Sequence, residues 1–294
     1  MKQIKPVGAG IGLRSQHYAY ILKNKPEVPW FEALTENYMG EGGMPLYYLE
    51  KIRQDYPITF HGVGMSLGSV DPLNMDYMKT LKYMIKRYQP LHISDHLSWV
   101  SFQKHYAHEL LPFPYNEQTL QHLSDKISSA QDYLGQEILV ENPSSYMNFK
   151  HSEINEWDFI NQLAKQTGCK ILLDVNNIYV SAFNTGLNAE DYIQNIDKQN
   201  ISEIHLAGFE DRGSHLYDTH GKEVSQAVWL LYQKLIKLGG AIPSLIEWDS
   251  HIPEFSVLLE EVHKAQEILD YNFTIAEPHS NYSSERITEI AANQ

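Results

Sequence analysis

The sequence contains a single cysteine, Cys169, among its 294 residues. One cysteine excludes an internal disulfide framework and any zinc site built from several thiolates. Cys169 stands just before the apolar run ILLD at residues 171–174. Because reactive thiols need an accessible, electropositive setting, this position predicts a buried packing residue and not a catalytic nucleophile.

Long hydrophobic runs are also absent. No apolar stretch approaches the roughly 20 residues that a membrane-spanning helix needs, and the polar start MKQIKPVGAG does not resemble a secretory signal. These two absences predict a cytoplasmic protein without a membrane partner.

Basic residues are scarce, with 23 Lys and Arg against 37 Asp and Glu and a formal net charge of −14. A nucleic-acid partner is normally met by a field of Lys and Arg, so the charge balance argues against one. A content of 43% hydrophobic and 20% charged residues is that of an ordinary globular chain. Bound cations would neutralise part of the acidic excess.

Short apolar runs alternate with longer amphipathic stretches along the whole chain. The runs predict eight strands, at residues 7–13, 30–35, 58–63, 91–96, 137–141, 171–175, 203–207 and 243–247. Gly168 and Gly239 are predicted to end two of the intervening helices, and Asn116 and Ser152 to cap the starts of two. Strand–helix alternation of this kind favours a (β/α)₈ TIM barrel, with a doubly wound sheet as the alternative. We expect one barrel domain over residues 1–270 and a polar tail over residues 271–294.

Polar residues end nearly every predicted strand. In a TIM barrel the carboxyl ends of all the strands meet at one face, where the catalytic residues lie. The candidates are Arg14, Glu36, Asn37, His61, Asp95, His96, Glu141, Asn142, Asp174, Asn176, Asn177, His205, Glu247 and Asp249, joined by Asp218 and His220 after the seventh strand. Carboxylates gathered in a barrel mouth repel one another unless they are neutralised, which predicts metal ions.

The kind of metal follows in part from the ligand atoms. Mixed nitrogen and oxygen ligands without thiolates suit zinc, manganese or iron better than magnesium or calcium. The candidates exceed the needs of one ion, so we expect two or three ions, with Glu141 placed to bridge them. Asp95 and His96 are adjacent in a strand and point to opposite sides, and we expect His96 to be the ligand. If residues 218–220 are extended, Asp218 and His220 point the same way.

The other histidines are assigned supporting or surface roles. His92 lies between apolar neighbours and is predicted to pack inside the barrel. His105 and His108 fall in a long predicted loop over the mouth, where they are candidates for substrate contact. The helical stretches carry His122, His151 and His263, which are predicted to face solvent.

A family resemblance rests on nine ordered segments: GAGIGLR, FEALTENYM, FHGVGMSLGS, ISDHLSW, ILVENPSSY, LLDVNNIYVSAFN, IHLAGF, YDTHG and LIEWD. In this order and spacing they resemble the multinuclear non-haem iron-dependent oxidative enzymes of the methanobactin biosynthesis protein B type. The resemblance covers about residues 6–269. It also extends to the broader superfamily of barrels that includes xylose isomerase and endonuclease IV.

The resemblance implies a ligand set of nine residues around three metals. It places His61, His96 and the bridging Glu141 at the first metal, and Asp174, His205 and Glu247, with Glu141, at the second. Asp218, His220 and Asn177 fall at the third, where Asn177 replaces a histidine of the nuclease and would bind more weakly. Glu141, Asp218 and His220 are the expected catalytic residues. The remaining strand-end residues are expected to support ligands or bind substrate: Arg14, Glu36, Asn37, Asp95, Asn142, Asn176 and Asp249.

The resemblance also implies an activity. Such enzymes use two to three iron ions in a mixed-valence Fe(II)/Fe(III) state, with dioxygen, to modify cysteine residues of ribosomally made precursor peptides. A small partner protein often binds the leader of that peptide. A cysteine thiolate is a soft anionic ligand that binds iron readily, so the chemistry suits the predicted centre.

Two alternatives stay open on the residues alone. The same barrel could carry a zinc or manganese hydrolase or a sugar isomerase, although a nuclease would need a basic groove that the acidic composition argues against. The chain could also bind metal without catalysis, but open coordination positions are typical of catalytic sites.

Overall fold

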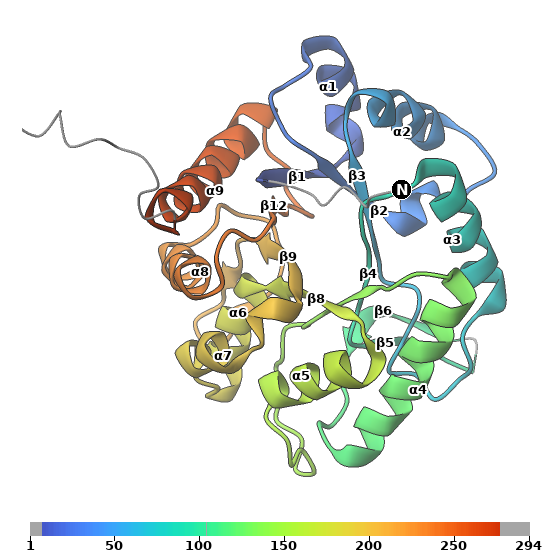
Figure 1. Cartoon of the computed structure of the whole chain (residues 1–294), viewed down its shortest axis with the longest axis vertical. Coiled ribbons are helices and arrows are strands. Elements are labelled where there is room, and N and C mark those ends of the chain that lie inside the picture. The colour runs from blue at the N-terminus through green and yellow to red at the C-terminus, as the bar shows by residue number, and fades with distance from the viewer. Residues whose placement is uncertain (1–7, 104, 277–294) are drawn as a thin grey trace, which may run out of the picture.

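Eight parallel strands close into a barrel, with helices forming a ring outside them (Figure 1). The structure is a computed structural model that describes residues 8–103 and 105–276, with side chains up to residue 271. The strands neighbour one another in the order β1-β12-β9-β8-β7-β4-β3-β2. Their bounds are β1 Ala9–Leu13, β2 Phe31–Leu34, β3 Ile58–Gly62, β4 Ile93–His96, β7 Leu139–Glu141, β8 Lys170–Asp174, β9 Ile201–Leu206 and β12 Ser244–Ile246. The predicted TIM barrel is confirmed, and each strand lies within or next to its predicted range.

The helices connect successive strands on the outside of the barrel. They are α1 Tyr18–Asn24, α2 Met44–Asp55, α3 Met75–Tyr88, α4 Glu117–Leu134, α5 Glu156–Thr167, α6 Val175–Thr185, α7 Ala189–Asn195, α8 Gln226–Gly239 and α9 Phe255–Ala276, with 3₁₀ turns η1 Ser15–His17, η2 Thr35–Tyr38 and η3 Lys198–Asn200. In the described part of the chain no helix is long and apolar enough to cross a membrane.

The core lies between the strands and the surrounding helices. Strands such as β8 (KILLD) are nearly continuous apolar runs, as expected for a parallel sheet covered on both faces. Phe31, Phe60 and Phe159 are completely buried in this layer. Burying one such side chain contributes about 1.5–3 kcal/mol to the free energy of folding. The apolar runs gain this energy when the strands close into the barrel and the helices cover them.

Strand register brings the polar strand ends together. His61 lies opposite Ser94, His96 opposite Glu141, and Asp174 opposite His205. Residues paired in this way on parallel strands point to the same side of the sheet. The polar ends therefore form one ring at the mouth of the barrel.

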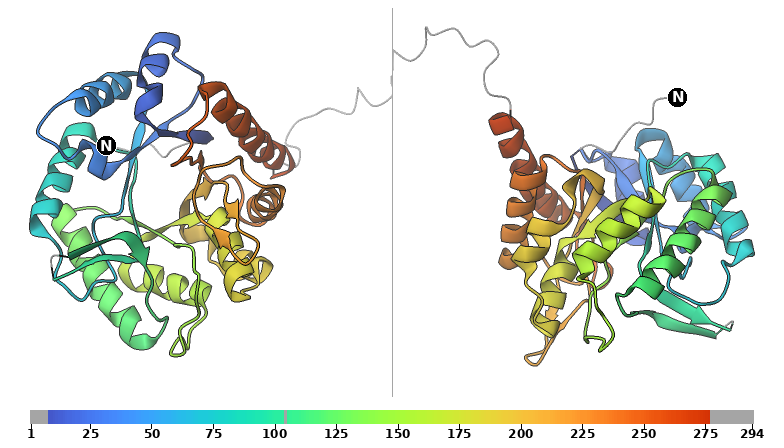
Figure 2. Two further views of the ribbon diagram at one scale, coloured as in Figure 1. Left: turned by 180° about the vertical axis from the view of Figure 1, so that it is seen from behind. Right: turned by 60° about the horizontal axis from the view of Figure 1, so that its bottom comes forward.

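Two hairpins rise beside this mouth. One joins β5 Trp99–Phe102 to β6 His105–Leu111, and the other joins β10 Glu210–Asp211 to β11 Leu216–Tyr217. Figure 2 shows both hairpins protruding from the same end of the barrel. The segment with His105 and His108 was expected to be a loop. That expectation is wrong because antiparallel pairing with β5 makes the segment a strand.

The helix ends agree with the sequence signals, with one exception. The Asn116 side chain caps α4 by accepting a hydrogen bond from the Thr119 N–H, and Gly168 ends α5 with a positive φ of 73°. Ser152 does not cap α5, because that helix begins at Glu156 and the Ser152 hydroxyl instead accepts a hydrogen bond from the backbone N–H of Tyr115. Helix α9 continues to Ala276, and the rest of the predicted tail lies outside the described residues.

Helix α5 starts with a buried acid. Glu156 is 7% exposed, and the Tyr192 hydroxyl donates a hydrogen bond to its Oε1 over 3.0 Å. Burial raises the pKa of Glu156 to about 7, against the opposing effect of hydrogen bonds from Tyr192 and Tyr115. The folded chain therefore binds this proton more tightly than the unfolded chain does.

Glu156→Gln should reduce the pH dependence of stability. Stability from the Glu156 proton is present at pH 4 and is lost as the pH rises from about 4.5 through about 7. Between pH 5 and pH 8 the parent should lose about 2 kcal/mol of unfolding free energy that the variant keeps. Urea unfolding of both proteins at the two pH values measures the difference. Parallel pH profiles would show that Glu156 is ionised throughout.

Candidate metal centre

Six buried side chains gather at the carboxyl ends of the barrel strands. None is more than 8% exposed, and each comes from a different strand or the residue following it: His61, His96, Glu141, Asp174, His205 and Glu247. Their ligand atoms fall into overlapping groups whose members all lie within 4.8 Å of one another. The predicted strand-end cluster is therefore brought together by the fold.

The first group contains His61, His96 and Glu141. Nε2 of each histidine lies 3.0 Å from Glu141 Oε2. His96 Nδ1 lies 3.1 Å from the Gly62 carbonyl, which can only accept, so His96 donates from Nδ1 and its Nε2 lone pair faces the carboxylate. Two acceptors in contact repel each other unless a cation lies between them. Two ligands that are each about 2.1 Å from one ion at a right angle are about 3.0 Å apart, which matches this spacing.

The second group contains Glu141, Asp174, His205 and Glu247, all buried. His205 Nδ1 lies 2.9 Å from Glu247 Oε2 and 3.7 Å from Glu141 Oε1. Glu141 thus contacts imidazoles of both groups, His61 and His96 through Oε2 and His205 through Oε1. A carboxylate in this position could serve both groups, as the predicted bridge requires.

The third group surrounds His220. Its Nε2 lies 2.7 Å from Asp218 Oδ1, and its Nδ1 lies 3.1 Å from Glu247 Oε2 and 3.3 Å from Asp249 Oδ2. Asp218 and His220 do point to one place, as predicted, but the segment is not simply extended, because His220 has a φ of 43°. Asp249, expected only to support the site, also belongs to a possible ligand group.

The electrostatics of the cluster are those of acids balanced by imidazoles. Burial opposes charge on His61, yet Glu141 and Glu32 raise its pKa to about 10. Burial likewise opposes charge on His220, and Asp218 and Glu247 nevertheless raise its pKa well above the ordinary value. Burial raises the pKa of Asp174 strongly. In the absence of cations, protons on His61, His205, His220 and Asp174 hold the acidic charge in check.

Several buried atoms of this cluster lack a hydrogen-bond partner. They are both carboxylate oxygens of Glu141, Asp174 Oδ2, Asn176 Oδ1, Asn177 Oδ1, His205 Nδ1 and His220 Nε2. A buried polar atom without a partner costs about 1–3 kcal/mol, so this many in one place call for a bound group. All are nitrogen or oxygen donors, and the residues present fit metal ions.

Three asparagines support this donor set. The Asn142 side chain exchanges two hydrogen bonds with the Asp174 backbone, and the Asn177 amide donates to the Asn142 carbonyl. That bond orients Asn177, whose Oδ1 has no partner and is available as a ligand. Asn176 donates to Asp218 Oδ1.

Arg14 lies beside Glu247 and Asp249 at the edge of the cluster. Its guanidinium lies 2.5 Å from Asp249 Oδ1 and 3.7 Å from Glu247 Oε1, and it donates to the Trp248 carbonyl. Arg14 thereby fixes two acids of the third group in place.

Glu36 and Asp95 lie beside the cluster, around Gly62. Asp95 accepts hydrogen bonds from the backbone N–H groups of Met65 and His96, and belongs to none of the ligand groups. A Cβ on Gly62 would lie 2.8 Å from the Tyr77 hydroxyl and 2.9 Å from Asp95 Oδ2, so any larger residue would displace these side chains. Asn37 is exposed in η2, on the surface.

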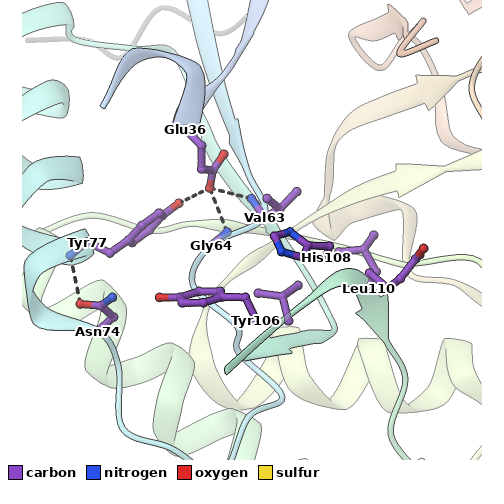
Figure 3. A pocket seen from close by; sticks show the side chains of 10 residues that line it. Glu36, Val63, Gly64, Asn74, Tyr77, Tyr106, His108 and Leu110 are labelled. Carbon is purple, nitrogen blue, oxygen red and sulfur yellow. Dashed lines mark hydrogen bonds between the residues drawn. The ribbon is translucent and has the colours of Figure 1, made fainter. Parts of the chain in front are cut away.

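A cavity of about 430 Å³ opens next to Glu36 (Figure 3). Glu36 Oε1 accepts hydrogen bonds from the N–H groups of Val63 and Gly64 and from the Tyr77 hydroxyl. The other walls come from α3, its preceding turn and the β5–β6 hairpin: Asn74, Val100, Tyr106, His108, Glu109 and Leu110. His108 therefore lies at this cavity. The pocket is largely apolar and stands beside the strand that carries His61.

Sequence reasoning missed the acids beneath the cluster. Glu32 and Glu203 are completely buried, and Glu32 Oε2 lies 3.3 Å from His205 Nε2. Glu203 is two residues from His205 on β9, so strand alternation was the available signal. His92 contacts Glu203 over 3.2 Å, in keeping with an interior role. His122 is partly buried and contacts the Ser69 carbonyl, contrary to the expected solvent-facing position, whereas His151 and His263 are exposed.

The fold and this cluster define a TIM barrel whose mouth carries overlapping groups of possible metal ligands. The chain belongs to the family of RiPP precursor modification enzymes MbnB/TglH/ChrH, whose model matches residues 8–270. RiPPs are ribosomally synthesised and post-translationally modified peptides. The predicted family is therefore confirmed.

The family membership agrees with individual comparisons. The chain is 52% identical over 262 residues to a UPF0276 protein of Acaryochloris marina, covering 89% of this chain and 95% of the relative. Solved structures of low sequence identity share the fold, and two of them serve as examples. D-psicose 3-epimerase from Clostridium cellulolyticum has a TM-score of 0.57 at 12% identity, covering 92% of this chain and 100% of that chain. Endonuclease IV from Thermus thermophilus has a TM-score of 0.54 at 11% identity, covering 91% of this chain and 99% of that chain.

Glu141→Gln should remove more metal than the loss of a ligand that serves one ion. Glu141 contacts imidazoles of two groups, so the amide weakens two sites, whereas His96→Ala weakens one. We expect the glutamine variant to lose about two ions per chain and the His96 variant about one. Elemental analysis of the purified proteins, after saturation with Fe²⁺ without oxygen, measures this. Full metal content in Glu141→Gln would disprove the bridge.

Proposed function

We propose that this chain is a multinuclear iron- and dioxygen-dependent oxidase that modifies a cysteine residue of a ribosomally made precursor peptide. The observation that carries the proposal is the set of overlapping donor groups joined by Glu141 and Glu247, in a chain whose family modifies such precursors. The donors are imidazoles, carboxylates and an amide, a set that suits iron. The working form holds two to three iron ions in a mixed Fe(II)/Fe(III) state.

Each group of the centre has a separate role in this proposal. Bound iron would supply a site for the substrate thiolate and redox chemistry with dioxygen. His61, His96 and His205 come from strands and hold a fixed geometry, because barrel strands are rigid. Asp218 and His220 belong to a loop, and the Asp218 side chain is 14% exposed. Asp218 is therefore placed to accept the proton that the substrate thiol loses.

Asp218 is held ready for this role by its neighbours. The Ser144 hydroxyl donates to its Oδ2 over 2.9 Å, and the Asn176 amide donates to its Oδ1 over 2.9 Å. Its backbone N–H donates to the Tyr146 hydroxyl. Hydrogen bonds of this kind fix the carboxylate where the substrate enters, between the loop after β7 and the β10–β11 hairpin.

The Glu36 cavity is the proposed binding site for the residue next to the reacting cysteine. Its lining from Val63, Val100 and Leu110 is apolar, and it lies on the mouth side of the barrel. An apolar side chain would bury its surface there while the neighbouring cysteine reaches the centre. A small partner protein that holds the peptide's leader would leave this end of the peptide free.

The function is tested with protein purified without oxygen. Elemental analysis and the absorption spectrum identify the bound metal, and the short cysteine-containing peptides encoded in neighbouring reading frames serve as substrates, with and without any small protein encoded beside them. The expected result is iron, and a mass change of one peptide that requires dioxygen and its cysteine. Bound zinc or manganese with hydrolysis or isomerisation, and no use of dioxygen, would establish the alternative function.

His220→Ala should abolish turnover while the barrel stays folded. The variant loses the loop imidazole, whereas the donors on the strands remain. The metal ions that these donors hold should still neutralise the buried carboxylates. We expect about one ion fewer per chain, a fall in melting temperature of only a few degrees, and at least a hundredfold loss of peptide modification. Metal content, melting temperature and dioxygen-dependent mass change are measured together. An active variant that lacks one ion would refute the role of the His220 group.

Leu110→Trp should weaken peptide binding and leave metal content unchanged. The indole fills the Glu36 cavity from the hairpin side, so the peptide residue has no space. We expect the dissociation constant of the peptide to rise about tenfold or more, since excluding one buried apolar side chain costs about 1.5–3 kcal/mol. Leu230→Trp, at a 57% exposed position on α8, is the matched control. Equal affinity in both variants would place the peptide elsewhere.

A further inference from the structure

A pair of acids lies below the metal centre, on the inside of the barrel. Glu32 is on β2 and Glu203 is on β9, and neither side chain is exposed to solvent. Their carboxylates converge on His205 Nε2, with Glu32 Oε2 at 3.3 Å and Glu203 Oε1 at 3.8 Å. Two acids buried this deeply need a reason, because burying charge without full compensation costs several kcal/mol.

The two ring nitrogens of His205 face different surroundings. Nε2 faces Glu32 and Glu203, whereas Nδ1 faces Glu247 at 2.9 Å and Glu141 at 3.7 Å. Nε2 makes a hydrogen bond to Glu32, and Nδ1 has no hydrogen-bond partner. Both nitrogens face carboxylates, but only the Nε2–Glu32 pair has the geometry of a hydrogen bond. The hydrogen of a neutral His205 therefore belongs on Nε2, and the Nδ1 lone pair points toward Glu247 and Glu141.

His205 is therefore turned the opposite way from the other two strand histidines. His61 and His96 present Nε2 to Glu141, and their Nδ1 atoms contact Ser94 Oγ at 2.8 Å and the Gly62 carbonyl at 3.1 Å. Those two partners are neutral. Of these three histidines, His205 alone has acids at the ring nitrogen that faces away from Glu141. A carboxylate partner makes an imidazole a stronger electron donor to a metal.

We propose that Glu32 and Glu203 are positioning residues that hold His205 as an Nδ1 ligand of the metal centre. Glu32 accepts a hydrogen bond from the Nε2–H of His205. Glu203 lies beside the same nitrogen through Oε1, and its Oε2 contacts His92 Nδ1 at 3.2 Å. The inference rests on the metal-binding part of the proposed function, but it needs neither the peptide nor dioxygen. Loss of such a partner typically weakens metal affinity 10- to 100-fold.

The test is a double-mutant cycle on metal affinity. The parent, Glu32→Leu, His205→Ala and the double variant are titrated with Fe²⁺, and separately with Zn²⁺, against a competing chelator without oxygen. We expect Glu32→Leu to lower the metal affinity 10- to 100-fold. The affected site should be the one that His205→Ala also weakens. In the His205→Ala background the same change should alter affinity by less than about twofold, because Glu32 acts only through the imidazole.

Two further variants keep the test decisive. Glu32→Gln is close in size to the parent residue and retains an oxygen acceptor, so it serves if Glu32→Leu does not fold, and its smaller loss should also vanish without His205. Glu156→Gln is the matched control, since it neutralises a buried acid of α5 that belongs to no ligand group. It should leave the metal affinity unchanged.

Three outcomes would overturn the proposal. Equal effects of Glu32→Leu with and without His205 would show a merely structural role. A metal ion lost in Glu32→Leu but kept in His205→Ala would show that the two acids themselves bind a cation. A parent that binds no metal would remove the proposed function as well, whereas a metal-binding parent without dioxygen-dependent activity would leave this inference standing.

Discussion

The structure depends on the need to neutralise three buried carboxylates that share one small volume. Glu141, Asp174 and Glu247 come from three strands and are at most 4% exposed. Without cations, His61, His205 and His220 hold protons, because the neighbouring carboxylates raise the pKa of each; that of His61 rises to about 10. With cations, those protons leave, because a ligand nitrogen must give up its hydrogen. Metal binding, protonation and folding are therefore linked through the same atoms.

The donors divide between rigid and adjustable parts of the fold. His61, His96 and His205 lie within strands whose register leaves them little freedom. Asp218 and His220 follow β11 and are held by side-chain contacts, among them a hydrogen bond from Ser144. In the proposed metal centre, most of the ligand positions would therefore be fixed, while one side could adapt to a substrate. This division also explains how one barrel class accommodates unrelated reactions through changes in its loops.

The sequence correctly indicated which strand-end residues gather at the mouth of the barrel. A polar residue that ends an apolar run has few other reasons to be there. His61, Glu141 and Glu247 all stand at such ends. Glu32 and Glu203 could not be found in this way, since they occur inside strands, where an acid normally indicates a solvent-facing position. Their partner His205 lies far from Glu32 in sequence, and only barrel closure brings the two together.

The irregular parts of the fold were harder to predict for a related reason. Residues 105–111 form a strand by pairing with β5, and His220 has a φ of 43° with acids on both sides of its ring. Ser152 has the chemistry of a helix cap but bonds to Tyr115 instead. For residues 105–111 and for Ser152, a contact outside the segment itself outweighs the local preference.

The barrel closes where its first and last strands meet, and one member of the cluster, Glu247, lies at that junction. β12 has only three residues and pairs with β1 on one side and β9 on the other, and Glu247 follows it directly. Arg14, which follows β1, contacts Glu247 and the Trp248 carbonyl. A ribosome must therefore release the chain as far as Glu247 before all the members of the cluster can meet. Until then the nascent barrel exposes an unfinished acidic mouth, so the proposed metal ions would bind only after β12 has been made.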